Sequence, residues 1–299
     1  MTTTLEFHQL DVFTDKPLGG NPLAVFPQPG RIDDDTMQAL ARELNLSETT
    51  FITGRDDARQ VYDVRIFTPC EEIPFAGHPT IGTAWLLFQE LGLDVAQLTL
   101  NLSVGRVPVR IDRAQDPPFV YFTPPPIELE EEFSDLERLS ALYSLEPSRF
   151  ALHRAPAQFV AAGIRFLIVP VTDRAALEAA EADIPALRSL LKSHDCQLLT
   201  SFCLEGYSPN AVAATRLFAP LTGVPEDPAT GSSASCLAHY LCHHGLIENC
   251  GEQWLKLDQG YSIGRPSALY LRANRKSDDE IAVHIGGQVV PVARGTFTI

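Results

Sequence analysis

The chain contains 299 residues, a length that predicts about two domains. Its 38 acidic residues outnumber its 23 basic residues, and the resulting formal net charge of −15 excludes nucleic acid as an expected partner. The first residues show no basic segment followed by an apolar core, and the apolar runs are far too short to span a bilayer. We therefore expect a cytoplasmic protein without a membrane partner.

The chain up to Phe122 predicts short strands and two helices. Asp33–Leu44 has acidic residues in its first turn and apolar residues on one face, as is typical of an amphipathic helix. The second predicted helix, Ile81–Leu91, ends before Gly92. Strands are predicted at Phe7–Phe13, Leu23–Phe26, Thr49–Thr53, Val61–Thr68, Leu98–Leu102 and Val104–Ile111.

A proline-rich and then acidic stretch follows Phe122. Thr123–Ile127 contains consecutive prolines, and Glu128–Glu132 is almost entirely glutamate, so neither helix nor strand is favoured and we expect a linker. The predicted halves are residues 1–124, which a strand near 289–299 would complete, and residues 130–288.

The second half predicts further helices and strands in a mixed order. Helices are predicted at Leu136–Leu142, Arg174–Leu191 and Ser235–His244, and strands at Phe166–Val171, Ala211–Phe218, Leu255–Leu257, Ser267–Arg272, Ile281–Ile285 and Val289–Ala293. Mixed strands with one helix at the centre of each half indicate an α+β fold rather than serial βαβ units.

The two halves repeat one pattern. Arg65-Ile66-Phe67-Thr68-Pro69 and Arg216-Leu217-Phe218-Ala219-Pro220 lie 216 − 65 = 151 positions apart, and Thr50-Phe51-Ile52 lies opposite Ser201-Phe202-Cys203 at the same offset. Downstream the offset becomes 150, so that Thr80 matches Thr230. The recurrence predicts an internal duplication.

Each copy has a turn that opens a helix, Phe75-Ala76-Gly77-His78-Pro79-Thr80 in one half and Glu226-Asp227-Pro228-Ala229-Thr230-Gly231-Ser232 in the other. Helix N-termini attract anions through unpaired N–H groups and the helix dipole. If the duplicated halves face each other, both turns line one cleft, which is our candidate active site. The alternative is that Thr, Ser, Asp and Gly serve there only as helix caps.

Glu48 is a charged residue directly before the predicted strand Thr49–Thr53, and the offset of 151 places Leu199 opposite it. A residue required by the fold should recur in both copies, whereas a catalytic group need not. The alternative is an exposed glutamate at a strand end.

The six cysteines are scattered and predict buried thiols rather than disulfides. His239 and His243 are spaced i, i+4 on one predicted helix, a spacing that can bind a metal. No glutamate follows His239 and the helix has an apolar stripe, so we expect surface histidines and no metal site.

Together these residues resemble the PhzF-like phenazine-biosynthesis isomerase family, which shares the diaminopimelate epimerase fold. The resemblance covers nearly the whole chain. The matching segments are Gly20-Asn21-Pro22-Leu23-Ala24-Val25, Asn45-Leu46-Ser47-Glu48-Thr49, both helix-opening turns and Gln259-Gly260. It implies two similar halves, each a curled mixed sheet around a central helix, with the site between them and a homodimer as the assembly.

The resemblance also implies roles for individual residues. Glu48 matches the family's acid/base group, with His78 and Asp227 assisting it, and Gly77 and Ser232 lie near the ligand carboxylate. Gly231, Asn21 and Gly260 are further expected substrate-binding residues. The cysteine pair of the related epimerases is replaced by Ala76 and Pro228, which disfavours racemisation by two thiols.

The leading hypothesis is an isomerase without cofactor or metal that shifts a proton in a small carboxylate substrate, amino-acid-like or cyclic and unsaturated. The family reaction isomerises trans-2,3-dihydro-3-hydroxyanthranilate. The alternatives are an amino-acid racemase or epimerase and a binding protein on the same fold. No dinucleotide-binding or phosphate-binding glycine motif is found in the chain.

Overall fold

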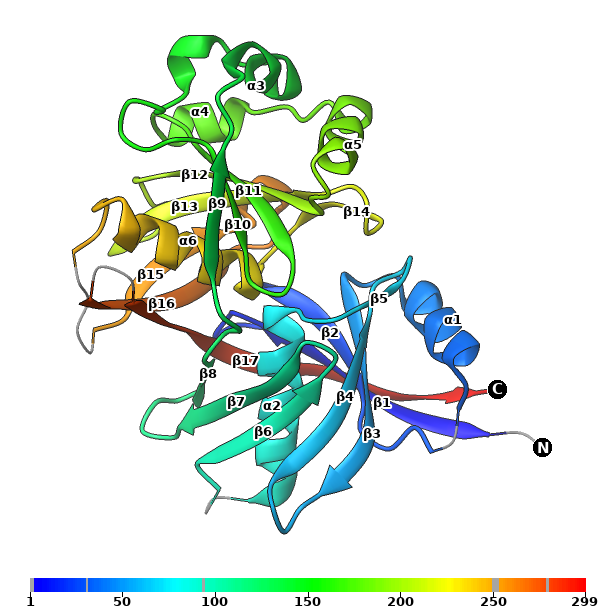
Figure 1. The fold of residues 1–299 in the computed structure, drawn as a ribbon. Helices are drawn as coiled ribbons and strands as arrows, with labels where there is room; N and C mark the ends of the chain where they lie inside the picture. Colours follow the sequence, from blue (N-terminus) through cyan, green and yellow to red (C-terminus); the bar gives the residue numbers. More distant parts are fainter. Residues whose placement is uncertain (1–2, 31, 93–94, 249–252, 278–279) are drawn as a thin grey trace. The chain divides into compact units, whose positions relative to one another are not determined.

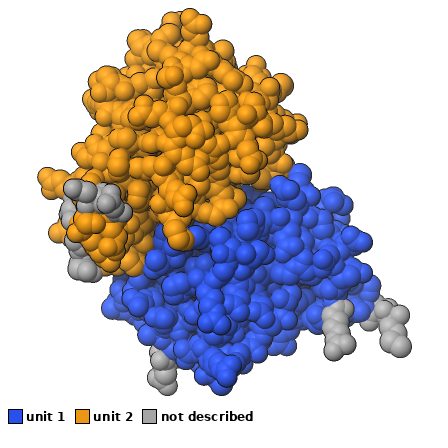
Figure 2. Space-filling model, in the orientation of Figure 1, with its two compact units in different colours: residues 1–125, 286–299 blue, residues 126–285 orange. Residues whose placement is uncertain are grey.

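The computed structural model describes residues 3–30, 32–92, 95–248, 253–277 and 280–299. The chain divides into two compact units, shown in different colours in Figure 2: unit 1 comprises Met1–Pro125 and Gly286–Ile299, and unit 2 comprises Pro126–Ile285. Because β17, Glu280–Thr298, continues past Ile285, the end of the chain returns to unit 1.

The strands of unit 1 form a closed ring. The ring strands are β1 (Thr4–Val12), β2 (Asn21–Phe26), β3 (Glu48–Asp56), β4 (Val61–Phe67), β6 (Gln97–Leu102), β7 (Gly105–Asp112), β8 (Phe119–Phe122) and the later part of β17. The short strand β5 (Glu72–Ile73) pairs with the end of β4 and is not part of the ring. The pairing runs β17–β1–β2–β3–β4–β6–β7–β8 and returns to β17. Closure leaves these strands without an open edge.

Helix α2 (Gly77–Leu91) runs along the inner face of this sheet, where it contacts β1, β2, β3 and β8 as well as β6 and β7, beside which Figure 1 shows it. Residues 77–88 are all buried. A side chain at Gly82 would collide with Leu23 and Val12, so glycine permits the helix to approach β2 and β1 closely. Helix α1 (Asp34–Leu44) covers the other face through a cluster that includes Met37, Leu40, Phe26, Phe51 and Phe67.

Unit 2 has the same plan with additional helices. Its strands are β9 (Glu128–Glu132), β10 (Gln158–Ala161), β11 (Arg165–Pro170), β12 (Leu198–Cys203), β13 (Ala211–Ala219), β14 (Val224–Asp227), β15 (Leu255–Gln259) and β16 (Ser267–Ser277). The pairing runs β9–β10–β11–β12–β13–β15–β16. Helix α6 (Gly231–His243) packs against β10, β11 and β16, while α3 (Leu136–Tyr143), α4 (Arg174–Ala179) and α5 (Ile184–Ser193) form a second apolar cluster.

Equivalent hydrogen bonds confirm the duplication. Thr50 of β3 bonds the Thr83 hydroxyl of α2 at 2.9 Å, and Thr200 of β12 bonds the Ser233 hydroxyl of α6 at 2.6 Å. Arg65 forms an ion pair with Glu72 in unit 1, as Arg216 does with Glu226 in unit 2. The predicted α+β fold, with one central helix in each curled sheet, is correct.

The register of the strands corrects the expected partner of Glu48. Glu48 is the first residue of β3 to pair with β2, opposite Leu23, and Leu198 is the first residue of β12 to pair with β11, opposite Phe166. The counterpart of Glu48 is therefore Leu198 and not Leu199. The offset is 150 on these strands but 151 on β4 and β13, because the connecting turns differ in length.

The predicted linker at Glu128–Glu132 was wrong, because these residues form β9 and pair with β10. The stretch is almost entirely glutamate, but Arg165 of β11 forms ion pairs with both Glu130 and Glu131. These ion pairs reach across β10, which lies between β9 and β11, and they offset the negative charge of the glutamates.

Two other predicted boundaries were also wrong. The helix expected at Arg174–Leu191 is divided into α4 and α5, because Asp183 caps a new helix by accepting a hydrogen bond from the backbone N–H of Ala186, and Pro185 stands in its first turn. The strands expected at Ile281–Ile285 and Val289–Ala293 are one strand, β17.

Most of the cysteines that the structure describes are buried free thiols, as predicted. Cys196, Cys203, Cys236 and Cys242 are buried, Cys70 is exposed, and Cys250 lies outside the described residues. Burial raises the pKa of Cys196 to about 12 and that of Cys203 to about 11.

No helix in the described part of the chain is long and apolar enough to cross a membrane.

Among the ion pairs Arg65–Glu72, Arg216–Glu226 and Lys276–Glu280, breaking Arg216–Glu226 should lower the free energy of unfolding most. Both side chains are only 11% exposed, and Arg216 also donates to the carbonyl oxygens of Leu177 and Ala180. We expect Glu226→Gln to lower the free energy of unfolding by about 3 kcal/mol, since it leaves a buried guanidinium without its carboxylate. Glu280→Gln, in the exposed Lys276–Glu280 pair, should cost less than about 1 kcal/mol. Urea unfolding of both variants checks this, and equal losses would contradict it.

Candidate active site

Unit 1 brings together four of the predicted site residues at one end of α2. Asn21 begins β2, Glu48 begins β3, and Gly77 and His78 form the first turn of the helix. Parallel pairing places the starts of β2 and β3 side by side, because Leu23 is in register with Glu48. The first N–H groups of α2 lie at the same end and have no partners within the helix.

His78 connects these residues. Its Nε2 lies 3.4 Å from a carboxylate oxygen of Glu48, and its Nδ1 lies 3.1 Å from the amide nitrogen of Asn21. The imidazole is 2% exposed, and this burial lowers the pKa of His78 to about 3. The contact with Glu48 favours the charged form, but it is longer than a good hydrogen bond, so burial dominates and His78 is neutral near neutral pH.

Phe51, although close to Glu48 in sequence, does not form an apolar wall beside its carboxylate. Successive side chains of a strand point to opposite faces. Thr50 points to α2, where it bonds Thr83, and Phe51 points to the α1 side, where it stacks on Phe26. Glu48 contacts His78 of α2 and therefore shares the face of Thr50. The Glu48 side chain is 15% exposed, so the α2 side of the sheet encloses most of it.

Unit 2 gathers the remaining predicted residues at the start of α6. Asp227 ends β14 and is buried, Gly231 and Ser232 begin the helix, and Ser232 is buried as well. Thr230 is the residue that precedes the helix, and its hydroxyl donates to a carboxylate oxygen of Asp227 at 2.5 Å.

Gln259, the last residue of β15, fixes this turn. Its amide nitrogen donates to the carbonyl oxygen of Asp227 at 2.9 Å and to the hydroxyl oxygen of Thr230 at 3.1 Å. Its amide oxygen accepts the backbone N–H of Thr230 at 3.1 Å. Gly260 follows with φ +80°, and a side chain there would come within 2.6 Å of the Pro228 carbonyl oxygen. The glycine therefore lets β15 approach the turn closely.

The sequence analysis missed Thr230 and Gln259 as functional residues. Thr230 lies in the second helix-opening turn and Gln259 in the matching segment Gln259-Gly260, but neither residue was assigned a role. Their bonds join segments about 30 positions apart, so spacing gave no signal. The structure thus forms one polar cluster in each unit, and the meeting of the two clusters in one cleft stays a prediction.

The histidine pair considered as a metal site lies on α6. His239 and His243 have nearly parallel rings with centroids 6.4 Å apart, and the described residues include no group of three or more side chains suited to a metal. Burial is the main cause that lowers the pKa of His239, to about 4. Cys70 is exposed and lies in the bend before β5.

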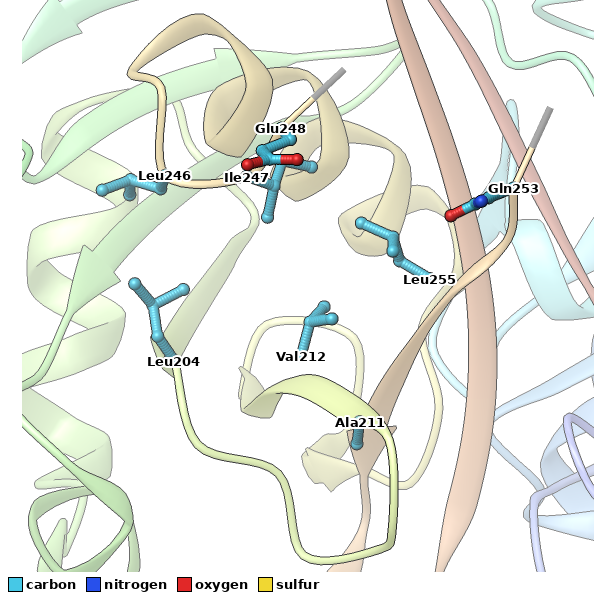
Figure 3. Close-up of a pocket in the computed structure, with 8 residues that line it drawn as sticks. All are labelled: Leu204, Ala211, Val212, Leu246, Ile247, Glu248, Gln253 and Leu255. Carbon is cyan, nitrogen blue, oxygen red and sulfur yellow. The ribbon is translucent and has the colours of Figure 1, made fainter. Parts of the chain in front are cut away.

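The hollow shown in Figure 3 has a volume of about 520 Å³ and lies in unit 2. Leu204, Val212 and Leu255 point toward it, with Leu246 and Ile247 nearby. None of the predicted site residues lines this hollow.

Comparisons with known proteins identify relatives over nearly the whole chain. A family model described as phenazine biosynthesis-like protein, PhzC-PhzF, matches residues 10–295. The trans-2,3-dihydro-3-hydroxyanthranilate isomerase of Pseudomonas aeruginosa is 37% identical over 289 residues, which cover 96% of each chain.

Solved structures show the same fold. A predicted epimerase from Pseudomonas aeruginosa superposes with a TM-score of 0.84 at 32% identity, covering 98% of this chain and 99% of the other. A PhzF-family phenazine biosynthesis protein from Bacillus anthracis has a TM-score of 0.88 at 24% identity, covering 99% and 100% of the two chains. The family model and the relatives extend over both units, and the chain therefore belongs to the phenazine biosynthesis-like PhzC-PhzF family.

Proposed function

We propose that this chain, an isomerase of the phenazine biosynthesis-like family, moves a proton between two carbons of a small carboxylate substrate with Glu48 as acid and base. The observation that carries the proposal is the pair formed by Glu48 and the neutral His78 at the start of α2. A single, mostly enclosed carboxylate can remove a proton from one carbon and return it to another on the same face of the substrate.

The asymmetry between the units supports a catalytic role for Glu48. Its counterpart in unit 2 is Leu198, which is buried. The duplicated fold therefore accepts an apolar residue at this strand start, and packing alone does not account for a carboxylate there.

His78 and Asp227 are proposed to assist by hydrogen bonding to the substrate's heteroatoms, with His78 Nε2 as a donor, because Nδ1 accepts from the Asn21 amide, and Asp227 as an acceptor. A neutral imidazole can donate through one nitrogen and accept through the other. Asn21 bonds Nδ1, so Nε2 is the nitrogen directed to Glu48 and the reacting atoms. Asp227 has the Thr230 hydroxyl as a donor, which favours a carboxylate that accepts from the substrate.

The substrate carboxylate is proposed to bind at the two helix starts, near Gly77, Gly231 and Ser232. Backbone N–H groups in a first helical turn and the helix dipole favour an anion. This requires both clusters to face one cleft. The relatives' reaction makes trans-2,3-dihydro-3-hydroxyanthranilate the first substrate to test. The proposal needs no cofactor or metal, and we further propose a cytoplasmic homodimer.

Epimerisation is the second candidate, because a structure similar at 32% identity carries the name of a predicted epimerase. An epimerase needs acid/base groups on both faces of one carbon, whereas the proposed isomerase needs Glu48 on one face. Three of the buried thiols do not supply such groups near neutral pH, since burial raises the pKa of Cys196, Cys203 and Cys236.

Glu48→Gln should lower kcat/KM for trans-2,3-dihydro-3-hydroxyanthranilate by about 10²-fold to 10⁴-fold, because the amide cannot accept the transferred proton. Turnover is followed by ultraviolet absorbance. Glu43→Gln, an exposed glutamate of α1, is the matched control and should leave kcat/KM unchanged. Full activity of Glu48→Gln would refute the assignment of the acid/base group.

Turnover in deuterated water distinguishes the two reactions. An isomerase should move a double bond. If the proton carried by Glu48 exchanges partly with the deuterated solvent, deuterium should appear at the carbon that receives the proton. An epimerase acting on amino acids should instead place deuterium at the α-carbon with loss of optical rotation. Proton NMR and polarimetry of the products separate these outcomes. Label at an α-carbon without a change in absorbance would favour the epimerase.

The charge state of His78 predicts how stability depends on pH. Its folded pKa of about 3 lies below the unfolded value of about 6.5, so its contribution is complete above about pH 6.5 and is lost as the pH falls toward 3. Between about pH 7.5 and pH 5 the protein should lose about 2 kcal/mol of unfolding free energy through His78.

This loss is measured as a difference between variants. Urea unfolding at both pH values should show about 2 kcal/mol less pH dependence in His78→Gln than in the unaltered protein. His153→Gln, in which an exposed histidine is replaced, should behave like the unaltered protein. Equal pH dependence in all three proteins would mean that the pKa of His78 in the folded protein is close to its value in the unfolded chain, and would contradict the prediction.

A further inference from the structure

We propose that Gln259 and Thr230 are positioning residues that orient the Asp227 carboxylate and keep it ionised. The proposal rests on the proposed function, because Asp227 matters to turnover only if it contacts the substrate.

The orientation of the Gln259 amide is determined by its backbone partners. A backbone N–H can only donate, so the amide atom next to the Thr230 N–H must be the oxygen. A backbone carbonyl can only accept, so the atom next to the Asp227 carbonyl oxygen must be the nitrogen. Both contacts give the same assignment, and Gln259 is 2% exposed, so water does not compete for these positions.

The amide in turn determines the direction of the Thr230 hydroxyl. The Gln259 nitrogen donates to the Thr230 oxygen at 3.1 Å, which leaves the single hydroxyl hydrogen to be donated elsewhere. The Asp227 carboxylate oxygen lies 2.5 Å from this hydroxyl and accepts it. Hydrogen bonds to a carboxylate stabilise its charged form and fix its rotamer.

The fold itself does not require the amide. Gln259 pairs with Thr215, one residue before Arg216, in the ladder of β13 and β15. In unit 1 the equivalent ladder of β4 and β6 reaches Asp63 and Asn101, so the next residue, beside Val64 and before Arg65, is Leu102. Leu102 is buried. Unit 1 thus has an apolar side chain where unit 2 has Gln259, as with Leu198 and Glu48.

The first experiment measures the pH dependence of kcat/KM for trans-2,3-dihydro-3-hydroxyanthranilate. Thr230→Val removes the donor to Asp227 and should move the acidic limb upward by about one pH unit, with about a tenfold loss on that limb and recovery at higher pH. Gln259→Leu introduces the side chain that unit 1 has at the equivalent position, Leu102, and should move the acidic limb in the same direction. Thr230→Ser keeps a hydroxyl and should restore the original profile.

A matched control removes another buried hydroxyl at α6. Thr200 bonds Ser233 of this helix and has no proposed role in turnover. Thr200→Val should leave the acidic limb in place, although it too loses a buried hydrogen bond. A shift of equal size in Thr200→Val would show a general effect of destabilising unit 2 and would overturn the proposal.

The second experiment does not depend on turnover. Carbon-13 NMR of the protein labelled at aspartate side-chain carboxyls, with Asp227→Asn to identify the signal, should show the Asp227 midpoint about one pH unit higher in Thr230→Val and Gln259→Leu. An unchanged midpoint in both variants overturns the inference. Full turnover by Asp227→Asn would instead remove Asp227 from the proposed function, and the NMR midpoints would still decide the inference.

Discussion

The enclosure of one helix by each curled sheet is the constraint on which the rest of the structure depends. Residues 77–88 of α2 are all buried, and so are residues 231–238 of α6. A helix enclosed on its sides has only its ends for polar chemistry, and its first N–H groups have no partners within the helix. In both units the polar side chains of interest gather at that N-terminal end.

The duplicated structure and the proposed chemistry follow different rules. Hydrogen bonds such as Thr50–Thr83 and Thr200–Ser233 recur, because both units must attach a buried helix to a sheet. Glu48 and Gln259 do not recur, since their counterparts are Leu198 and Leu102. Residues that break an internal symmetry are therefore better candidates for function than residues that preserve it.

The two clusters also differ in how they control charge. The partner of Glu48 is an imidazole that burial keeps neutral. His78 therefore places no full positive charge beside the carboxylate to oppose its protonation. Near Asp227 the partner is a hydroxyl whose direction an amide determines. One arrangement suits a group that gains and loses a proton, and the other suits a group that remains an acceptor.

The sequence by itself determined the family, the α+β class, the duplication and most strands, because periodicity, helix caps and motifs are local properties. It also indicated Glu48, His78 and Asp227 as candidates. Tertiary structure alone decided that Glu128–Glu132 is a strand, since Arg165 lies more than 30 positions away and offsets its charge. It decided as well that Phe51 points away from Glu48, and that Thr230 and Gln259 bond Asp227. Such contacts depend on register and on which strand lies beside which turn, and neither is encoded in the spacing of residues along the chain.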